Sequence, residues 1–387
     1  MDIKRVFLIV LDSLGIGELP DAKDFGDKGS NTLASISKSK EFNIKTLSEL
    51  GLFNIDGVNC KEKYPSPKGA YGRFLEASHG KDTTTGHWEI AGLISKDAFP
   101  TYPDGFPDDI IDEFKRLTKR GVLCNKPYSG TKVIEDYGAE HIKTGDLIVY
   151  TSADSVFQIA AHEEIVPIDE LYSICEKARE LLNPIGVGRV IARPFKGEKG
   201  NFYRTENRHD YSLVPPKKTV LNYLKDAGYD VISIGKISDI FSGSGIVKAI
   251  RTKSNADGME KTYEVLNEEF SGLCFINLVD FDMLFGHRND RDGYAKALAE
   301  FDKWLSTFIE KMKDNDVLMI TSDHGCDPDT PSTDHSREYT FLLAYGKTVK
   351  SVNLGTRKSF SDIGKTIAEI FNIEADICGE SFKGDIL

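Results

Sequence analysis

Three apolar segments of this 387-residue chain end in aspartate, and this pattern constrains the fold more than any other feature. Each segment runs directly into acidic residues: 7–11 into Asp12, 274–279 into Asp280 and Asp282, and 318–322 into Asp323 and His324. Parallel strands of an open α/β sheet place their carboxyl ends at one edge, where ligands bind. We therefore expect these acidic residues to converge, and cations are needed to offset their mutual repulsion.

Apolar runs and helical patterns alternate along much of the chain. Near-continuous apolar runs, as expected for strands buried on both faces, lie at 5–11, 229–235, 273–280, 316–322 and 339–345. Helical patterns lie between and after them, at 219–226, 257–269, 291–313 and 361–371. This alternation predicts a doubly wound α/β domain.

The middle of the chain departs from this alternation. Residues 97–107 are rich in proline and aromatic residues, and 211–218 contain a Pro-Pro pair, so both indicate chain breaks. Between the breaks we expect strands at 147–151 and 188–193, and helices near 108–119 and 168–182. The sequence therefore predicts a smaller α/β domain, residues 98–216, inserted into a larger one made of residues 1–97 and 217–387.

Charge and cysteine content exclude several classes of protein. The net charge of −12, from 49 basic and 61 acidic side chains, disfavours nucleic acid or an anionic membrane as the main partner. Six scattered cysteines without a C-x-x-C pair are typical of free thiols. The N-terminal apolar stretch is too short for a signal segment, and no window offers about 18 consecutive apolar residues. We expect a cytoplasmic protein, and a monomer because no helix shows an obvious exposed apolar face.

Histidines near the three aspartate-tipped segments are candidate metal ligands. Two adjacent ligands at a strand end can face one metal once the strand turns, and a following glycine, Gly325, allows that turn. Asp280 and Asp282 share a face if the strand continues, so either could be the ligand. The candidates besides Asp12 are Asp280 or Asp282, His287, Asp323, His324, Asp334 and His335.

The mixture of imidazole and carboxylate ligands limits the choice of metal. It suits Mn²⁺ or Zn²⁺, and the excess of carboxylate favours Mn²⁺. Cys326 follows the Asp-His-Gly segment directly and raises the question of a thiolate ligand. We do not expect Cys326 to bind the metal, because its neighbours already supply oxygen and nitrogen ligands.

Residues 81–89, with the sequence KDTTTGHWE, contain three consecutive threonines. A pair of metal ions typically serves phosphoryl transfer by holding the attacking and leaving oxygens. A threonine hydroxyl becomes a nucleophile when a metal lowers its pKa. The same residues could instead cap a helix that starts near Gly86. Both roles are compatible, because a helix N-terminus favours a phosphate group.

Long motifs, in order along the chain, carry a family resemblance. They are LIVLDSLGIGELPDA, GKDTTTGHWE, VIARPF, NRHDY, IGKISDIF, RTKSN, NLVDFDMLFGHR and TSDHG followed by TDHSREY. With them the chain resembles the phosphopentomutase family of the alkaline phosphatase superfamily over nearly its whole length. The resemblance implies an alkaline-phosphatase-like doubly wound core with a smaller inserted α/β cap domain.

The resemblance also implies an activity and cofactors. An isomerase of this family interconverts ribose 1-phosphate and ribose 5-phosphate, and the 2-deoxy sugars, through a phosphothreonine and a 1,5-bisphosphate intermediate. It uses two metal ions, usually Mn²⁺, and a sugar bisphosphate activator such as glucose 1,6-bisphosphate or ribose 1,5-bisphosphate. The alternative on the same core is a metal-dependent phosphatase or another phosphomutase of the superfamily.

The resemblance assigns roles to individual residues. One metal would be held by Asp282, His287 and His335, and the other by Asp12, Asp323, His324 and the oxygen of Thr83, the phosphorylated nucleophile. Substrate contacts would come from Asp154, Arg189, Arg193, Arg208 and Arg204 of the inserted domain and from Lys236 of the core. Arginine forks suit a phosphate, and an aspartate suits a ribose hydroxyl. The chain departs from the family pattern at Thr84, where Met is frequent, and at Cys326, where Asn is common.

Overall fold

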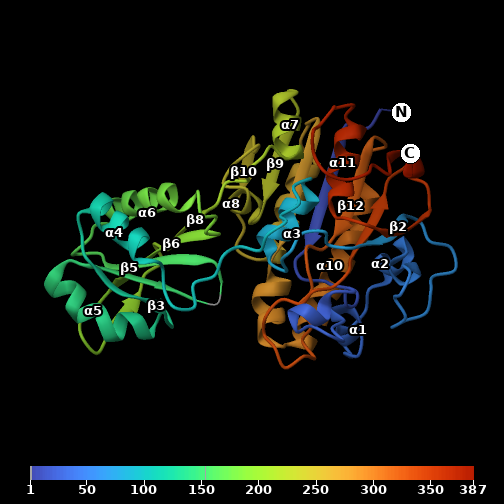
Figure 1. Cartoon of the computed structure of the whole chain (residues 1–387). Coiled ribbons are helices and arrows are strands. Elements are labelled where there is room, and N and C mark those ends of the chain that lie inside the picture. Colours follow the sequence, from blue (N-terminus) through green and yellow to red (C-terminus); the bar gives the residue numbers. More distant parts are fainter. Residues whose placement is uncertain (1, 153) are drawn as a thin grey trace. The chain divides into compact units, whose positions relative to one another are not determined.

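The computed structural model describes residues 2–152 and 154–387, and the chain divides into two compact units (Figure 1). The core unit comprises the residues up to Ala98 together with Pro215–Leu387. The inserted unit comprises Phe99–Val214. The sequence placed the insertion at 98–216, so each boundary differs by one or two residues from the observed division.

An eight-stranded sheet forms the centre of the core unit. Its strands are β1 (Arg5–Leu11), β2 (Ala70–Phe74), β9 (Asp230–Ile234), β10 (Lys248–Ile250), β11 (Gly272–Leu278), β12 (Asp316–Thr321), β13 (Thr340–Tyr345) and β14 (Asn353–Arg357). The strand order is β10-β9-β11-β1-β12-β13-β2-β14. β1 pairs in parallel with both β11 and β12, and β9 and β10 continue the parallel arrangement, whereas β13 is antiparallel to both of its neighbours. The carboxyl ends of β9, β11, β1 and β12 therefore share one edge.

Helices pack on the two faces of this sheet. One set consists of α1 (Thr32–Ile36), α2 (Lys45–Leu50), α9 (Asn255–Leu266) and α10 (Arg291–Lys311), and the other of α3 (Thr83–Ile90), α7 (Val220–Asp226), α8 (Ile237–Ile240), α11 (Ser361–Ile370) and α12 (Lys383–Ile386). Alternate residues of a strand point to opposite faces. Accordingly Phe7 and Ile276 pack into the cluster that contains Leu298 of α10, whereas Phe275 contacts Phe241 at the end of α8.

A second sheet forms the inserted unit. Its strands are β3 (Val122–Pro127), β4 (Leu147–Thr151), β5 (Val156–His162), β6 (Arg189–Lys196), β7 (Tyr203–Arg204) and β8 (His209–Ser212), in the order β3-β4-β5-β6-β7 with β8 also paired to β6. Its helices are α4 (Asp108–Thr118), α5 (Lys132–Thr144) and α6 (Ile168–Leu182). Phe114 of α4 and Leu171 of α6 share one apolar cluster, and Val133 of α5 belongs to another. This unit thus has helices on both sides of its own sheet.

These observations confirm the predicted α/β class with a doubly wound core sheet and a second, smaller α/β unit. All six cysteines lie among the described residues and are free thiols, as predicted. In the described part of the chain, no helix combines the length and apolar character needed to span a membrane.

Candidate metal centre

The three predicted aspartate-tipped strands lie side by side. β1 lies between β11 and β12, and Asp12, Asp282 and Asp323 follow the carboxyl ends of these three strands. Asp12 and Asp323 are fully buried, and Asp282 is 5% exposed. Buried carboxylates at neighbouring strand ends require compensating positive charge, because water cannot screen their mutual repulsion.

The structure distinguishes the two aspartates that the sequence left open. The carboxylate of Asp280 accepts a hydrogen bond from the backbone N–H of Asn255 at 2.6 Å, and Asn255 Oδ1 accepts one from the Asp280 N–H at 2.9 Å. Asp282 instead lies on the turn η3 (Phe281–Phe285), with its oxygens 3.2 Å from His287 Nε2 and 3.3 Å from His335 Nε2. The strand does not continue past Asp280, so Asp282 is the aspartate that faces the histidines.

A second group of side chains surrounds His324. Its Nε2 lies 3.4 Å from Asp12 Oδ1 and 3.3 Å from Asp323 Oδ2. The same Nε2 is 3.2 Å from the hydroxyl oxygen of Thr83. The predicted ligands Asp12, Asp323, His324 and Thr83 are therefore together in space.

Backbone carbonyls orient two of the histidines. His287 Nδ1 donates a hydrogen bond to the Thr333 carbonyl at 2.7 Å, and His324 Nδ1 donates to the Gly325 carbonyl at 3.0 Å. A carbonyl oxygen only accepts, so Nδ1 carries the proton in both rings. Nε2 of each ring is left for the site, which is the arrangement found in metal-binding histidines.

Several buried polar atoms at this edge have no hydrogen-bond partner. They are Asp12 Oδ1, Asp282 Oδ1, Asp323 Oδ2 and His335 Nε2. Leaving such atoms unpaired in the interior is costly, whereas a cation would satisfy them. Oxygen and imidazole nitrogen donors suit Mn²⁺ or Zn²⁺. The residues present therefore fit bound divalent ions.

The potential ligand atoms form three overlapping groups within the described chain. Each has its atoms within 4.8 Å of one another: Asp12, Asp323 and His324; Asp282, His324 and His335; and Asp282, His287 and Cys326. The first matches the ligand set expected for one ion. For the other ion, Asp282 is common to two alternative groups, and the predicted trio of Asp282, His287 and His335 is divided between them.

The charges of the centre perturb one another. Burial and the nearby charge of Asp323 raise the pKa of Asp12. Burial also acts to raise the pKa of Asp282, but the nearby His287 and His335 rings outweigh it and hold that pKa well below its ordinary value. The hydrogen bond to Asp282 raises the pKa of His287 to about 9. In the metal-free protein, protons on histidine thus supply part of the missing positive charge.

The threonine triplet begins helix α3, and its members have different environments. Asp82 is the N-cap, and its carboxylate accepts hydrogen bonds from the backbone N–H groups of Thr84 at 3.0 Å and Thr85 at 3.1 Å. The hydroxyl of Thr85 donates to Asp82 at 2.6 Å. The capping role therefore belongs to Asp82, and the hydroxyl of Thr83 faces His324 instead.

Gly86 and Gly325 lie where neighbouring atoms leave no space for a side chain. A Cβ on Gly86 would lie 2.3 Å from the carbonyl oxygen of Asp323, so only glycine lets α3 approach the end of β12 this closely. Gly325 was expected to allow the chain to turn after β12, and the chain bends at Asp323 and His324, but Gly325 itself has no positive φ. A Cβ on Gly325 would lie 2.5 Å from Glu338 Oε1, so the requirement there is for space.

Several supporting residues escaped the sequence analysis. Ser13 adopts a left-handed conformation with φ of 69°, and its N–H donates to Asp323 Oδ1 at 3.1 Å. Asn277 donates to Asp12 Oδ2 at 2.7 Å. Arg337, 3% exposed, pairs with Glu76 at 2.7 Å and donates to carbonyls of the segment that leads into α3. Ser13, Asn277 and Arg337 all lie inside the long motifs, which was the available signal.

The predicted substrate-binding arginines of the inserted unit form a group that we call the arginine cluster: Arg189, Arg193, Arg204 and Arg208. Arg208 Nε and Nη2 each donate a hydrogen bond to a carboxylate oxygen of Asp210 at 2.7 Å. Arg189 Nη1 lies 3.9 Å from Asp210 Oδ2. Burial, together with the positive charges of Arg208 and Arg204, lowers the pKa of Arg193. The cluster therefore has more positive charge than its own carboxylates balance.

The two remaining residues predicted to contact the substrate, Asp154 and Lys236, belong to different units. Asp154 is exposed, with its Oδ2 3.7 Å from Arg189 Nη2, so it accompanies the arginine cluster. Lys236 follows β9 at the carboxyl edge of the core sheet and is exposed. Both side chains are accessible to a ligand.

Comparison with known proteins first establishes the class. The model of the Metalloenzyme superfamily matches residues 4–375, so the chain is a member of that superfamily. The solved structure of the PH0037 protein from Pyrococcus horikoshii superimposes with a TM-score of 0.52 at 16% identity, covering 98% of this chain and 100% of that chain, and shows the shared fold.

Sequence relatives then identify the family. A phosphopentomutase of Lachnoclostridium phytofermentans is 61% identical over 383 residues, covering 98% of each chain. A phosphopentomutase of Clostridium novyi is 58% identical and covers 100% of both chains. The chain belongs to the phosphopentomutase family and is an enzyme of that family.

Proposed function

We propose that the protein interconverts ribose 1-phosphate and ribose 5-phosphate, and the corresponding 2-deoxy sugars, with a phosphorylated Thr83 as the working form. One observation supports this proposal above all others. The Thr83 hydroxyl lies 3.2 Å from His324 Nε2, beside buried carboxylate oxygens that have no hydrogen-bond partner. A hydroxyl at a prospective cation site is suited to nucleophilic attack on phosphorus.

Asp12, Asp323 and His324 would hold one divalent ion with Thr83, and Asp282, His287 and His335 the other. When bound, the ions supply the positive charge that lowers the pKa of the Thr83 hydroxyl and neutralises the phosphoryl oxygens. The oxygen donors, from three aspartates and Thr83, outnumber the three imidazole nitrogens, which favours Mn²⁺ for this role.

Thr83 carries the phosphoryl group in both halves of the reaction. Phosphorylated Thr83 donates its phosphoryl group to the free hydroxyl of the sugar phosphate, and the threonine oxygen takes up the proton that this hydroxyl loses. The resulting 1,5-bisphosphate reorients, and Thr83 then accepts the other phosphoryl group. The dipole of α3 favours a negative phosphate on Thr83 at its N-terminus, although the N–H groups of Thr84 and Thr85 already bond to Asp82. A sugar bisphosphate, such as glucose 1,6-bisphosphate or ribose 1,5-bisphosphate, would phosphorylate Thr83 initially.

The arginine cluster is proposed to bind the phosphate that is not being transferred. Planar guanidinium groups bind phosphate oxygens in pairs, and the cluster carries uncompensated positive charge. Asp154 would accept a hydrogen bond from a ribose hydroxyl, and Lys236 would supply further positive charge. Loss of the bisphosphate would leave Thr83 without its phosphoryl group, whereas water reaching the phosphothreonine would turn the mutase into a phosphatase, so the enzyme must retain the first and exclude the second. The monomeric state and the cytoplasmic location stay predictions.

Substitution of the threonines tests the nucleophile. We expect Thr83→Ala to keep its bound metal but to lose mutase turnover by at least about 10³-fold, as for the loss of other covalent nucleophiles. Thr84→Ala is the matched control, since it removes the adjacent hydroxyl and should keep turnover. Metal content is measured by elemental analysis, and turnover by formation of ribose 1-phosphate. Retained turnover in Thr83→Ala would contradict the assignment.

A further inference from the structure

The segment that joins β2 to α3 has no regular secondary structure, although Thr83 follows it directly. Residues 75–82 form neither helix nor strand. Within this segment Glu76, Ser78 and Gly80 are buried. Buried backbone groups outside helices and sheets still need hydrogen-bond partners. The place of the Thr83 hydroxyl therefore depends on the side chains that hold this segment.

One buried guanidinium group, that of Arg337, meets three carbonyls of the segment. Its Nη2 donates to the carbonyl of Glu76 at 3.1 Å. Its Nη1 donates to the carbonyls of Ser78, at 2.9 Å, and Gly80, and also to Glu76 Oε2 at 2.7 Å. Asp21 accepts from Nε at 3.2 Å and from Nη2 at 3.0 Å. All three guanidinium nitrogens are therefore used, and they hold the segment at every second residue.

The backbone and the outer part of Arg337 are fixed as well. Its N–H donates to Asp27 Oδ2 at 2.9 Å, and its carbonyl accepts from the N–H of Leu19 at 3.0 Å. The ring of Phe25 packs on the guanidinium group, with its centroid 4.7 Å from Cζ. An arginine that is anchored at both ends transmits position, because its planar fork has a fixed geometry.

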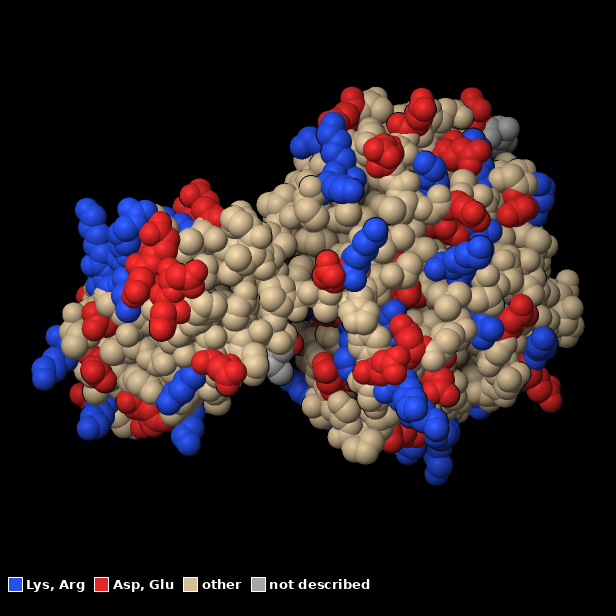
Figure 2. Space-filling view, in the orientation of Figure 1, with Lys and Arg blue, Asp and Glu red and all other residues tan. Residues whose placement is uncertain are grey.

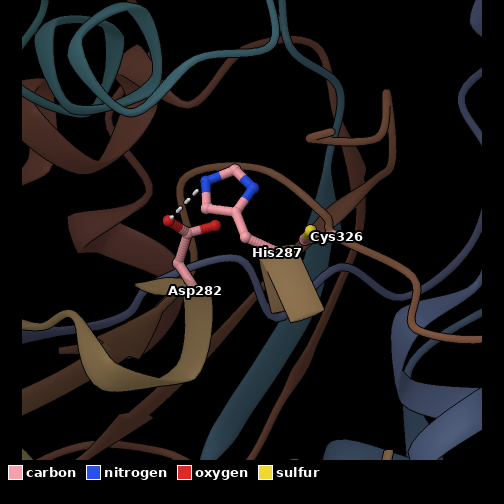
Figure 3. A group of neighbouring side chains, drawn as sticks. All are labelled: Asp282, His287 and Cys326. Carbon is pink, nitrogen blue, oxygen red and sulfur yellow. Dashed lines mark ion pairs between the residues drawn. The ribbon is translucent and has the colours of Figure 1, made fainter. Parts of the chain in front are cut away.

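Arg337 belongs to the same segment as a proposed metal ligand. His335 lies two positions before it, and His335 Nε2 is 3.3 Å from Asp282 Oδ1. Figure 3 shows the Asp282 carboxylate facing the ring of His287. The bonds of Arg337 therefore join the segment that leads to Thr83 with a segment of the metal centre.

The pairing with Glu76 determines how Arg337 can be tested. Burial raises the pKa of Glu76 well above its ordinary value, and the charge of Arg337 opposes this rise. Removing the positive charge would leave a buried carboxyl group without its partner, which threatens folding. Lysine keeps the charge, but its donors lie on one nitrogen and cannot reproduce the planar fork. Arg337→Lys therefore separates the charge from the fork.

We propose that Arg337 is a positioning residue for phosphoryl transfer, whose guanidinium group holds residues 76–80 so that the Thr83 hydroxyl keeps its place beside His324. The inference rests on the proposed function, since it concerns the proposed nucleophile. Arg337 acts through the backbone of the segment rather than on the reacting oxygen. A displacement of about 1 Å at a reacting group can cost about 100-fold in rate. Loss of the fork should therefore lower kcat and leave KM for ribose 5-phosphate nearly unchanged.

The rate at which Thr83 takes up a phosphoryl group tests the proposal directly. The Mn²⁺ forms of the wild type and Arg337→Lys are mixed with ribose 1,5-bisphosphate, and phosphorylation of Thr83 is followed by mass spectrometry of quenched samples. We expect Arg337→Lys to be phosphorylated about 10- to 100-fold more slowly, with kcat lowered to the same extent and KM within about twofold of the wild type. Bound metal, measured by elemental analysis, should be unchanged.

Two further variants serve as comparisons. Arg357→Lys is the matched control, because Arg357 also pairs with a carboxylate, Asp362, and donates to a carbonyl, that of Glu380. Its side chain holds the C-terminal part of the chain, so phosphorylation should keep the wild-type rate. Glu76→Gln removes the ion pair but leaves the carbonyl bonds of Arg337, and it should also stay close to that rate. A loss in Glu76→Gln equal to that in Arg337→Lys would overturn the proposal.

Hydrogen exchange of the metal-free protein measures the hold on the segment without turnover. Peptides that cover residues 76–88 should exchange at least about fivefold faster in Arg337→Lys than in the wild type, and Arg357→Lys should match the wild type there. Equal exchange, or equal rates of Thr83 phosphorylation, in Arg337→Lys and the wild type would overturn the proposal. A wild type that takes up no phosphoryl group on Thr83 would instead contradict the proposed function, so the two failures are distinguishable.

Discussion

The metal centre of the core unit gathers buried carboxylates with too few donors, whereas the arginine cluster of the inserted unit gathers cations with too few acceptors. Asp12 and Asp323 are fully buried, but the side chains of Arg189 and Arg208 are 40% and 46% exposed (Figure 2 shows the charged surface of the molecule). A buried excess of charge must be neutralised by a tightly held ion, while an exposed excess stays solvated until an anion arrives.

The two regions also differ in how firmly their groups are held. In the metal centre, backbone carbonyls fix the rings of His287 and His324, and backbone N–H groups fix Asp323 and the N-cap of α3. In the arginine cluster, Arg208 is held by two 2.7 Å bonds to Asp210, whereas Arg189 makes only loose approaches of 3.7 Å and 3.9 Å. We infer that the core is preformed for chemistry and the cluster adapts to substrate.

The largest expected effect comes from removing charge in the metal centre. Asp12→Asn should lower turnover by at least about 10³-fold, because a proposed ligand of the catalytic ion is lost. The same change should stabilise the metal-free protein, since burial and the charge of Asp323 both raise the pKa of Asp12 and so disfavour its charged form. Turnover with Mn²⁺ and thermal unfolding in a chelator measure the two effects.

Asp280→Asn is the matched control for this change. The Asp280 carboxylate accepts from Asn255 and does not face the histidines, and an amide oxygen can accept the same bond. We expect turnover and metal content close to those of the wild type. Equal losses in both variants would contradict the choice of Asp282 as the ligand.

An intermediate effect is expected in the arginine cluster. Arg193→Lys keeps the charge but removes the planar fork, so kcat/KM for ribose 5-phosphate should fall by about 10- to 100-fold, mostly through KM. Metal content should not change, unlike in Asp12→Asn. Arg116→Lys, an exposed residue of α4 that pairs with Glu113, is the control. A fall in kcat with constant KM would contradict a binding role.

A pH dependence, which is smallest when measured over a single pH unit, also separates the regions. The pKa of His287 is raised from 6.5 to about 9. The proton on His287 therefore stabilises the metal-free protein fully below pH 6.5, and this stabilisation is lost as the pH rises through about 9. Mn²⁺ affinity should therefore rise with pH, by up to about tenfold per unit, and level off above about 9. Calorimetric titration measures this slope, and a flat profile would contradict it.

Sugar-phosphate binding to the metal-free protein is the comparison for this experiment. Arginine stays protonated in proteins, so binding through the arginine cluster should be nearly constant between about pH 7.5 and 9.5. A steep pH dependence of sugar-phosphate binding over this range would contradict the difference that we infer between the two regions.

The sequence predicted the parts of the fold that have strong local patterns. β1, β9, β11, β12 and β13 are continuous apolar runs, and their predicted ranges agree with the structure to within two residues. β2 and β14 were missed, because they are short strands on the far side of β13 whose pairing depends on distant segments. α5 was missed as well; Gly138 interrupts its pattern and packs under Phe202. The predicted break at 211–218 overlaps the end of β8, which pairs with β6.

The site shows the same division between local and tertiary information. Strand-end aspartates were predictable, since the apolar runs fix where each strand ends. The residues alone left Asp280 and Asp282 open, the family resemblance chose Asp282, and the η3 segment after β11 gives the physical reason. The cap by Asp82 required the path of α3. The proximity of Cys326 to Asp282 depends on how the segments after β11 and β12 meet, which no local pattern encodes.

The most direct test of the account follows two products in one reaction. The Mn²⁺ form is incubated with ribose 5-phosphate and a trace of ribose 1,5-bisphosphate, and ribose 1-phosphate and free phosphate are measured together. The account predicts that ribose 1-phosphate accumulates to equilibrium, depends on the bisphosphate and is accompanied by little free phosphate. Release of free phosphate in step with the loss of ribose 5-phosphate, without ribose 1-phosphate, would contradict it.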